Sequence, residues 1–205
     1  VCEASLRRFR TDHLDFFFCH RPDFDTPVEE VVRTMNDLMT QGKILYWGTS
    51  DHPADMLMAM HAAAEKMQME GPHMEQTWYN MLGRKRIEDE LVPLFDRYGM
   101  GSTVYQPLHG GILTGKYQDG IPEGSRLDKL EWTRSDRTEE RLAKVRRLGD
   151  LAQELGLSMP VFAIAWVLKN PSVSTAVLGA SKPEQMAENV QAVEAQEKLT
   201  DDVME

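Results

Sequence analysis

The sequence has 205 residues, of which 41% are hydrophobic and 27% charged, a balance that supports a buried core and excludes a disordered chain. Its formal net charge is −10 and its longest basic run is Arg84–Arg86, so we expect neither nucleic acid as a partner nor insertion into a membrane. It shows no signal peptide, no bilayer-spanning apolar run and no metal-binding cysteine pattern. Two cysteines allow one disulfide at most, and we expect a soluble protein of the cytoplasm.

Segments of helix and strand character alternate along the chain, beginning with an amphipathic helical pattern at 3–9. Apolar runs predict strands at 14–19, 44–50, 74–80, 101–108 and 173–180. Amphipathic or apolar stretches predict helices at 26–43, 53–68, 86–99, 138–156, 159–170 and 182–193. The glycine-rich and charged stretch from 109 to 136 is expected to be irregular.

The helix predicted at 26–43 carries signals for both of its ends. Thr26 is expected to cap the start, Pro27 suits the first turn, and Glu29 can close a capping box. Gly42 is expected to end the helix.

Strands that alternate with helices predict an α/β fold with a parallel sheet, and both a doubly wound sheet and a (β/α)8 barrel fit this pattern. No glycine fingerprint follows the first strand, which argues against a dinucleotide-binding Rossmann fold. Both ends of the chain have helical character, so we expect residues 1–205 to be a single domain cut at its N-terminus and slightly at its C-terminus. A barrel needs about 250 residues, and five units plus three missing N-terminal ones would complete it.

Functional residues of a parallel α/β fold gather at the carboxyl ends of the strands. Polar groups stand there at 20–23, 49–52, 76–80, 105–108 and 179–181. Ser181 precedes a helix and either caps it or contributes to an anion site, and the segment alone favours neither interpretation. Cys19 and His20 are expected to point to opposite faces of their strand, which argues against a Cys–His nucleophile pair. His20 itself is structural or catalytic, whereas His52 and His109 are expected in surface loops.

Five stretches together resemble the aldo-keto reductase superfamily. They are "DHLDFFFCHRPDFDTPVEEVVRTMNDLMTQGKILYWGTS", "MEQTWYNM", "PLHGGILTGKY", "GIPEGSR" and "VLGASKPEQMAEN". Within it, "YWGTS" and "GIPEGSR" resemble the branch of voltage-gated potassium channel β-subunits and their bacterial relatives. The resemblance implies a (β/α)8 TIM barrel, of which this chain supplies the fourth to eighth strands. It also implies reduction of aldehydes and ketones by direct hydride transfer from NADP(H).

The resemblance also implies roles for individual residues. His20 matches the catalytic histidine that orients the substrate carbonyl, where the channel β-subunits have asparagine. The nicotinamide end of the cofactor is matched by Ser50, Asp51, Gln76 and the stacking Tyr105. The diphosphate is matched by Gln106, Pro107, Leu108, Gly110, Lys116 and Arg126, and the adenosine end by Gly179, Ser181, Gln185, Glu188 and Asn189. Asp51 and Gln185 depart from common family residues, and NADPH is expected over NADH.

The family's other three catalytic residues are an aspartate, a tyrosine and a lysine on the first three units, outside this sequence. We therefore expect the intact protein to reduce a small carbonyl substrate and the 205 residues alone to be inactive. The alternative is a regulatory module that binds the cofactor without fast turnover. An aldolase would need a lysine at a strand end, which the five predicted ends do not offer. The substrate and the oligomeric state stay open.

Overall fold

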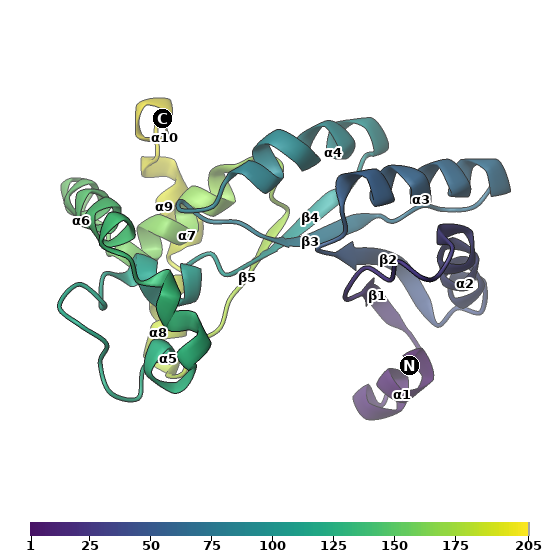
Figure 1. Ribbon diagram of the computed structural model, residues 1–205, viewed down its shortest axis with the longest axis horizontal. Helices are drawn as coiled ribbons and strands as arrows, with labels where there is room; N and C mark the ends of the chain where they lie inside the picture. Colours follow the sequence, from purple (N-terminus) through teal and green to yellow (C-terminus); the bar gives the residue numbers. More distant parts are fainter. Residues whose placement is uncertain (205) are drawn as a thin grey trace. The chain divides into compact units, whose positions relative to one another are not determined.

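The computed structural model describes residues 1–204 and has an α/β fold with five strands (Figure 1). Two compact units make up the chain, one of residues 1–77 and 85–103, the other of residues 78–84 and 104–205. They are called unit 1 and unit 2. The strand order in the sheet follows the chain, β1-β2-β3-β4-β5, and the boundary between the units passes through β3 and β4.

Unit 1 contains most of the regular strand structure. Its strands are β1 (Leu14–Cys19), β2 (Ile44–Ser50), β3 (Met74–Trp78) and β4 (Gly101–Tyr105), the last residues of β3 and β4 belonging to unit 2. Its helices are α1 (Cys2–Phe9), α2 (Val28–Thr40), α3 (Ala54–Met67), a π-helical turn η1 (Arg86–Leu91) and α4 (Val92–Tyr98).

Parallel pairing fixes which residues of unit 1 share a face of the sheet. Strand β1 pairs with β2 so that Cys19 lies opposite Thr49, and β2 pairs with β3 so that Thr49 lies opposite Glu75. Since side chains alternate between faces along a strand, the next residues, Ser50 and Gln76, share the opposite face.

The core of unit 1 forms between the sheet and helices α1, α2 and α3. Its buried members are Cys2, Leu6, Val32, Met35, Ile44, Trp47, Met60 and Ala64. Helices α2 and α3 pack against each other, as their neighbouring ribbons in Figure 1 show. Full burial of such side chains stabilises the fold by about 1.5–3 kcal/mol each.

Unit 2 is mainly helical. Its elements are η2 (His109–Thr114), α5 (Arg126–Lys129), η3 (Glu131–Asp136), α6 (Glu139–Glu154), α7 (Met159–Lys169), β5 (Thr175–Val177), α8 (Pro183–Asn189), α9 (Ala192–Ala195), η4 (Gln196–Lys198) and α10 (Asp201–Met204). Helix α7 is apolar on all sides and packs against α6, α8, α9, β5 and η2, so it forms the centre of this unit. A second core cluster comprises Ile112, Leu113, Tyr117, Leu127, Leu142, Val145 and Ala163.

The predicted elements are present, and several of their boundaries differ. The first two strands match their predicted ranges, β3 and β4 are shorter at the carboxyl end, and β5 is shorter at both ends. The helix predicted at 86–99 starts as the π-helical η1, the helix at 182–193 is divided between α8 and α9, and the irregular stretch 109–136 holds short helical turns.

The cap predicted for α2 is wrong. Its N-cap is Pro27, with no side-chain hydrogen bond, and the Thr26 hydroxyl instead donates to Asp23 Oδ2 at 2.8 Å. The Thr26 hydroxyl is therefore bonded within the loop before the helix and does not form the predicted capping box.

No single helix among the described residues is long and apolar enough to cross a membrane. Helices α6 and α7, bent by 90° at the break between them, pass that test only as a pair and only by length and composition.

Candidate functional site

The carboxyl ends of β1, β2 and β3 bring three predicted site residues of unit 1 together. His20 directly follows Cys19, the last residue of β1, and Cys19 pairs with Thr49, the residue before Ser50. Ser50 pairs with Gln76 in the register, and its hydroxyl donates to Gln76 Oε1 at 3.5 Å. His20 is exposed, whereas Ser50 is buried and Gln76 half-buried. A hydroxyl, an amide and an imidazole therefore stand at one edge of the sheet.

Asp51 turns the chain directly after β2. Its backbone lies in the left-handed region with φ of 54°, which non-glycine residues rarely adopt. The Asp51 N–H donates to the Gln76 carbonyl at 2.9 Å, and Arg21 donates to Asp51 Oδ2 at 2.8 Å. Backbone strain of this kind concentrates at functional sites. Asp51 thus occupies the turn beside Ser50 that the sequence assigned to the nicotinamide end.

A buried carboxylate lies on the other face of the sheet, beneath this turn. Glu75 is fully buried and accepts hydrogen bonds from the Thr49 hydroxyl and, at 3.0 Å, from the His52 N–H. The Arg86 guanidinium lies 3.6 Å from Glu75 Oε1 and donates to the His52 carbonyl. Burial raises the pKa of the Glu75 carboxyl to about 7, although the hydrogen bonds from Thr49 and His52 and the charge of Arg86 lower it.

The sequence reasoning missed Glu75 and Arg86. The available signal was an acid in the second position of a strand expected to be buried on both faces, since a buried carboxylate requires partners. Its partner Arg86 was noted only as the last residue of the basic run Arg84–Arg86.

Two histidines expected in surface loops are buried, so that prediction is wrong. His52 is 1% exposed, and its Nδ1 lies 3.1 Å from the Ser50 carbonyl. His109 is 5% exposed, adopts φ of 47°, and its backbone N–H donates to the Gln106 carbonyl at 2.9 Å. Burial lowers the pKa of both imidazoles. Tight turns folded both rings inward, which their turn-like sequence context did not indicate.

Cys19 packs against the core of unit 1, away from the edge that carries His20. Burial raises the pKa of the Cys19 thiol to about 11, so it is protonated at neutral pH. Cys2 and Cys19 are both free thiols. The structure therefore agrees with the argument against a Cys–His nucleophile.

In unit 2, a tight turn follows strand β4. Gln106 adopts φ of 55°, and the Asn80 side-chain amide donates to its carbonyl at 3.1 Å. Pro107 is buried, and Leu108 packs against the second core cluster. Tyr105 is half-buried, and its carbonyl accepts the Tyr79 N–H at 3.4 Å. The carbonyls of Tyr105 and Gln106 are therefore bonded within the unit.

Two cations lie beside the glycines that follow this turn. A side chain on Gly110 would meet Arg126 Nε at 3.8 Å, and one on Gly111 would meet Lys116 Nζ at 3.2 Å. Both glycines have positive φ. Lys116 and Arg126 are exposed, so their charged groups are accessible to an anion approaching the glycine backbone.

The residues predicted for the adenosine end lie before α8 and along it, as far as its last residue, Asn189. Gln185 Oε1 accepts the Ser181 N–H at 2.9 Å, the Ser181 hydroxyl at 3.1 Å and the Lys182 N–H at 3.2 Å. Gly179 is exposed. The donors that an anion would use are thus bonded to Gln185. In the same helix Glu188 is half-buried and Asn189 is buried, so the predicted residues differ in accessibility.

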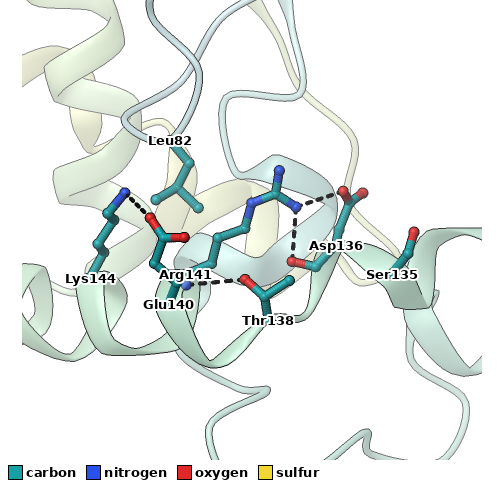
Figure 2. Close-up of a pocket in the computed structure, with 7 residues that line it drawn as sticks. All are labelled: Leu82, Ser135, Asp136, Thr138, Glu140, Arg141 and Lys144. Carbon is teal, nitrogen blue, oxygen red and sulfur yellow. Dashed lines mark hydrogen bonds and ion pairs between the residues drawn. The ribbon is translucent and has the colours of Figure 1, made fainter.

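A cavity of about 480 Å³ in unit 2 is lined by none of the predicted site residues (Figure 2). Its lining consists of Leu82, Ser135, Asp136, Thr138, Glu140, Arg141 and Lys144. Arg141 donates to Asp136 Oδ1 at 2.8 Å, and Lys144 pairs with Glu140 at 2.8 Å. The cations are already paired with acids, so this cavity offers no unbalanced charge to a ligand.

Comparison with known proteins identifies relatives over the whole chain. The model of the aldo/keto reductase family matches residues 1–205. The chain is 45% identical to the putative voltage-gated potassium channel subunit beta of Schizosaccharomyces pombe, over 98% of this chain and 60% of that protein. It is 40% identical to the probable voltage-gated potassium channel subunits beta of Oryza sativa subsp. japonica and Arabidopsis thaliana, over 98% and 99% of this chain and 63% of each of those proteins. The chain thus spans less than two thirds of the length of these relatives.

Proposed function

The chain belongs to the aldo/keto reductase family, and from this premise we propose that it carries the cofactor-binding part of an NADP(H)-dependent reductase of small aldehydes or ketones. The observation that carries the proposal is the convergence of His20, Ser50 and Gln76 at the carboxyl ends of adjacent parallel strands. Ligands of parallel α/β folds bind at this edge of the sheet. We assign the five strands to the fourth to eighth strands of a (β/α)8 barrel, in a cytoplasmic protein.

The residues at this edge fit the nicotinamide carboxamide. A carboxamide offers one acceptor and two donors, and the Ser50 hydroxyl and Gln76 amide supply complementary groups 3.5 Å apart. In unit 2, Lys116 and Arg126 flank glycine backbone, which fits a diphosphate. At the start of α8 the fit is incomplete, because Gln185 must release the Ser181 and Lys182 donors before they can bind the adenosine 2′-phosphate.

The bound nicotinamide would supply the hydride, and His20 would orient the carbonyl oxygen of the substrate. Reduction also requires an acid within about 3 Å of that oxygen. We assign this role to none of the five tyrosines of the sequence. Tyr46 shares the face of Ser50 but lies four residues earlier in β2, or about 13 Å along the strand. The remaining four fill other roles.

Two of those tyrosines have hydroxyls bonded elsewhere. The Tyr79 hydroxyl accepts from the Asn170 amide at 2.8 Å, and the Tyr117 hydroxyl accepts the Leu127 N–H at 3.3 Å. Tyr98 stacks on a histidine ring, and Tyr105 is the last residue of β4, where we assign it to stack on the nicotinamide. We therefore propose that these 205 residues alone do not reduce carbonyls, although the intact protein does.

The second candidate is a regulatory module that binds the cofactor without fast turnover. The names of the relatives favour it, since all three are described as voltage-gated potassium channel subunits beta. His20 favours the reductase, because the channel branch has asparagine at the matching position. Both candidates require cofactor binding and differ in turnover.

The proposal is tested by titrating the 205-residue protein with NADPH and following nicotinamide fluorescence. We expect saturable binding, weaker binding of NADH, and no aldehyde-dependent oxidation of NADPH with 4-nitrobenzaldehyde. Lack of NADPH binding would contradict the proposed function, and robust turnover would contradict the inactivity of this chain. The same turnover assay on the intact protein separates the two candidates, since rapid multiple turnovers indicate the reductase.

A further inference from the structure

The turn that presents Ser50 is held from both sides of the sheet. On the site face, the Asp51 N–H donates to the Gln76 carbonyl and Arg21 donates to the Asp51 carboxylate. On the opposite face, Glu75 accepts the His52 N–H. Each residue of the turn is therefore bonded to a neighbouring strand or to the loop after it.

Arg86 completes the support beneath the turn. Its guanidinium donates to the His52 carbonyl, donates to the Thr77 hydroxyl at 3.2 Å and pairs with Glu75 at 3.6 Å. Thus Glu75 bonds the N–H of His52 while Arg86 bonds its carbonyl, and one peptide segment is fixed at both of its polar groups. Arg86 opens a π-helical turn, a rare geometry that often marks functional sites.

Stability alone does not account for this arrangement. Burying a carboxylate carries a large loss of hydration that its partners must offset, and apolar replacements of buried ion pairs are often neutral or stabilising. The left-handed φ of Asp51 adds a further cost. Both costs fall on the same turn, directly beside Ser50 and Gln76.

We propose that Glu75, paired with Arg86, is a positioning residue that fixes the turn of residues 50–52 so that Ser50 and Gln76 bind the nicotinamide carboxamide. The inference rests on the proposed function. Glu75 faces away from the ligand and acts through the backbone of His52 and the hydroxyl of Thr49. Removing its charge loosens the turn and leaves both contacting side chains in place.

The pH dependence of NADPH binding distinguishes a positioning role of the Glu75 charge from a role in general packing. The charged groups around Glu75 are Arg86 and Asp51, and burial lowers the pKa of the adjoining His52 imidazole. The ionised carboxylate accepts from two donors and pairs with Arg86, whereas the protonated acid loses one acceptor site and the ion pair. The cost of burying the charge is the same with and without cofactor, because it is incurred on folding. Since the ionised form holds the turn more firmly, NADPH should bind more tightly at pH 8 than at pH 6.

The experiment compares the wild-type chain with Glu75→Gln, which keeps the shape and removes the charge. Glu70→Gln is the matched control, because that side chain is 69% exposed and lies 3.9 Å from Nε2 of its neighbour His73. We measure amide exchange at His52 by NMR and the Kd for NADPH by fluorescence at pH 6 and pH 8. In Glu75→Gln we expect His52 to exchange about tenfold faster and the Kd to rise about tenfold at pH 8, equivalent to the loss of one charged hydrogen bond.

Glu75→Gln should also flatten the change in Kd between pH 6 and pH 8, while Glu70→Gln keeps the wild-type profile. If Glu75→Gln does not fold, Thr49→Val removes one donor to the carboxylate and should shift both measurements in the same direction. Unchanged His52 exchange, or wild-type NADPH affinity in a folded variant, overturns the inference. Failure of the wild-type chain to bind NADPH overturns the proposed function instead, and exchange at His52 then decides separately whether Glu75 holds the turn.

Discussion

The buried carboxyl of Glu75 shows how one residue ties stability to pH in this protein. Its ordinary pKa is 4.5, and burial raises it to about 7 in the folded chain. A carboxyl with a raised pKa binds its proton more tightly when folded. Its favourable contribution is therefore complete below pH 4.5 and is lost as the pH rises through 7.

Glu75→Gln should expose this linkage. We expect the wild-type free energy of unfolding, relative to that of the variant, to decrease by up to about 3 kcal/mol between pH 4.5 and pH 8, because only the wild type must ionise a buried group. Urea unfolding at several pH values measures the difference. Glu70→Gln should show no such pH-dependent difference from the wild type, and a constant gap between wild type and Glu75→Gln would contradict the raised pKa.

Residue positions at strand ends could be predicted from alternation and register alone. Alternation predicted opposite faces for Cys19 and His20, and in the structure Cys19 packs against the core of unit 1 while His20 is exposed. These two rules could not reveal Glu75, because its partners His52 and Arg86 come from other segments of the chain. Polar pairs between distant segments leave no periodic pattern in the sequence. The residues on the face of Ser50 and Gln76 could therefore be predicted, whereas the support by Glu75 on the opposite face could not.

At the scale of elements, apolar periodicity predicted which segments are strands and which are helices. It did not predict the π-helical start of the helix expected at 86–99. Pro93 lacks an N–H and its ring crowds the carbonyl four residues earlier, so regular α-helical bonding cannot run through this segment. The chain adopts the wider turn of η1 before Pro93 and continues as α4.

Helix caps provide a second contrast between pattern and structure. The Thr138 hydroxyl accepts the Arg141 N–H at 3.3 Å and caps α6, whereas Thr26 makes no cap to α2. A capping motif therefore allows a cap but does not guarantee one, because the hydroxyl can bond another polar group nearby.

We predict that Thr138→Ala lowers the free energy of unfolding by about 1 kcal/mol, the usual cost of a lost N-cap. Thr26→Ala, its matched control at a position without a cap, should change it by less than about 0.5 kcal/mol, because the lost bond to Asp23 is exposed. Denaturant unfolding followed by circular dichroism measures both. Equal losses in the two variants would show that the bond to Arg141 contributes nothing specific.

At the scale of the whole molecule, alternation of strands and helices was sufficient to predict an α/β fold, since covering both faces of a parallel sheet leaves few other arrangements. The sequence also lacks the glycine fingerprint that is typical of a dinucleotide-binding Rossmann fold. It did not predict that α7 would be the packing centre of unit 2, because a helix that is apolar on all sides does not indicate which neighbours cover it.

The net charge of −10 opposes the binding of an anionic dinucleotide, so affinity must depend on local cations. Lys116 and Arg126 are exposed beside glycine backbone, and we expect Lys116→Gln and Arg126→Gln each to raise the Kd for NADPH about fivefold, as the loss of an exposed charged contact of about 1 kcal/mol would. The Kd for NADH should rise by the same factor, because the diphosphate is common to both nucleotides. Fluorescence titration with each nucleotide measures this, with Lys129→Gln on the exposed face of α5 as control. Weakening confined to NADPH would place these cations at the 2′-phosphate, and unchanged affinity for both nucleotides would remove them from the site.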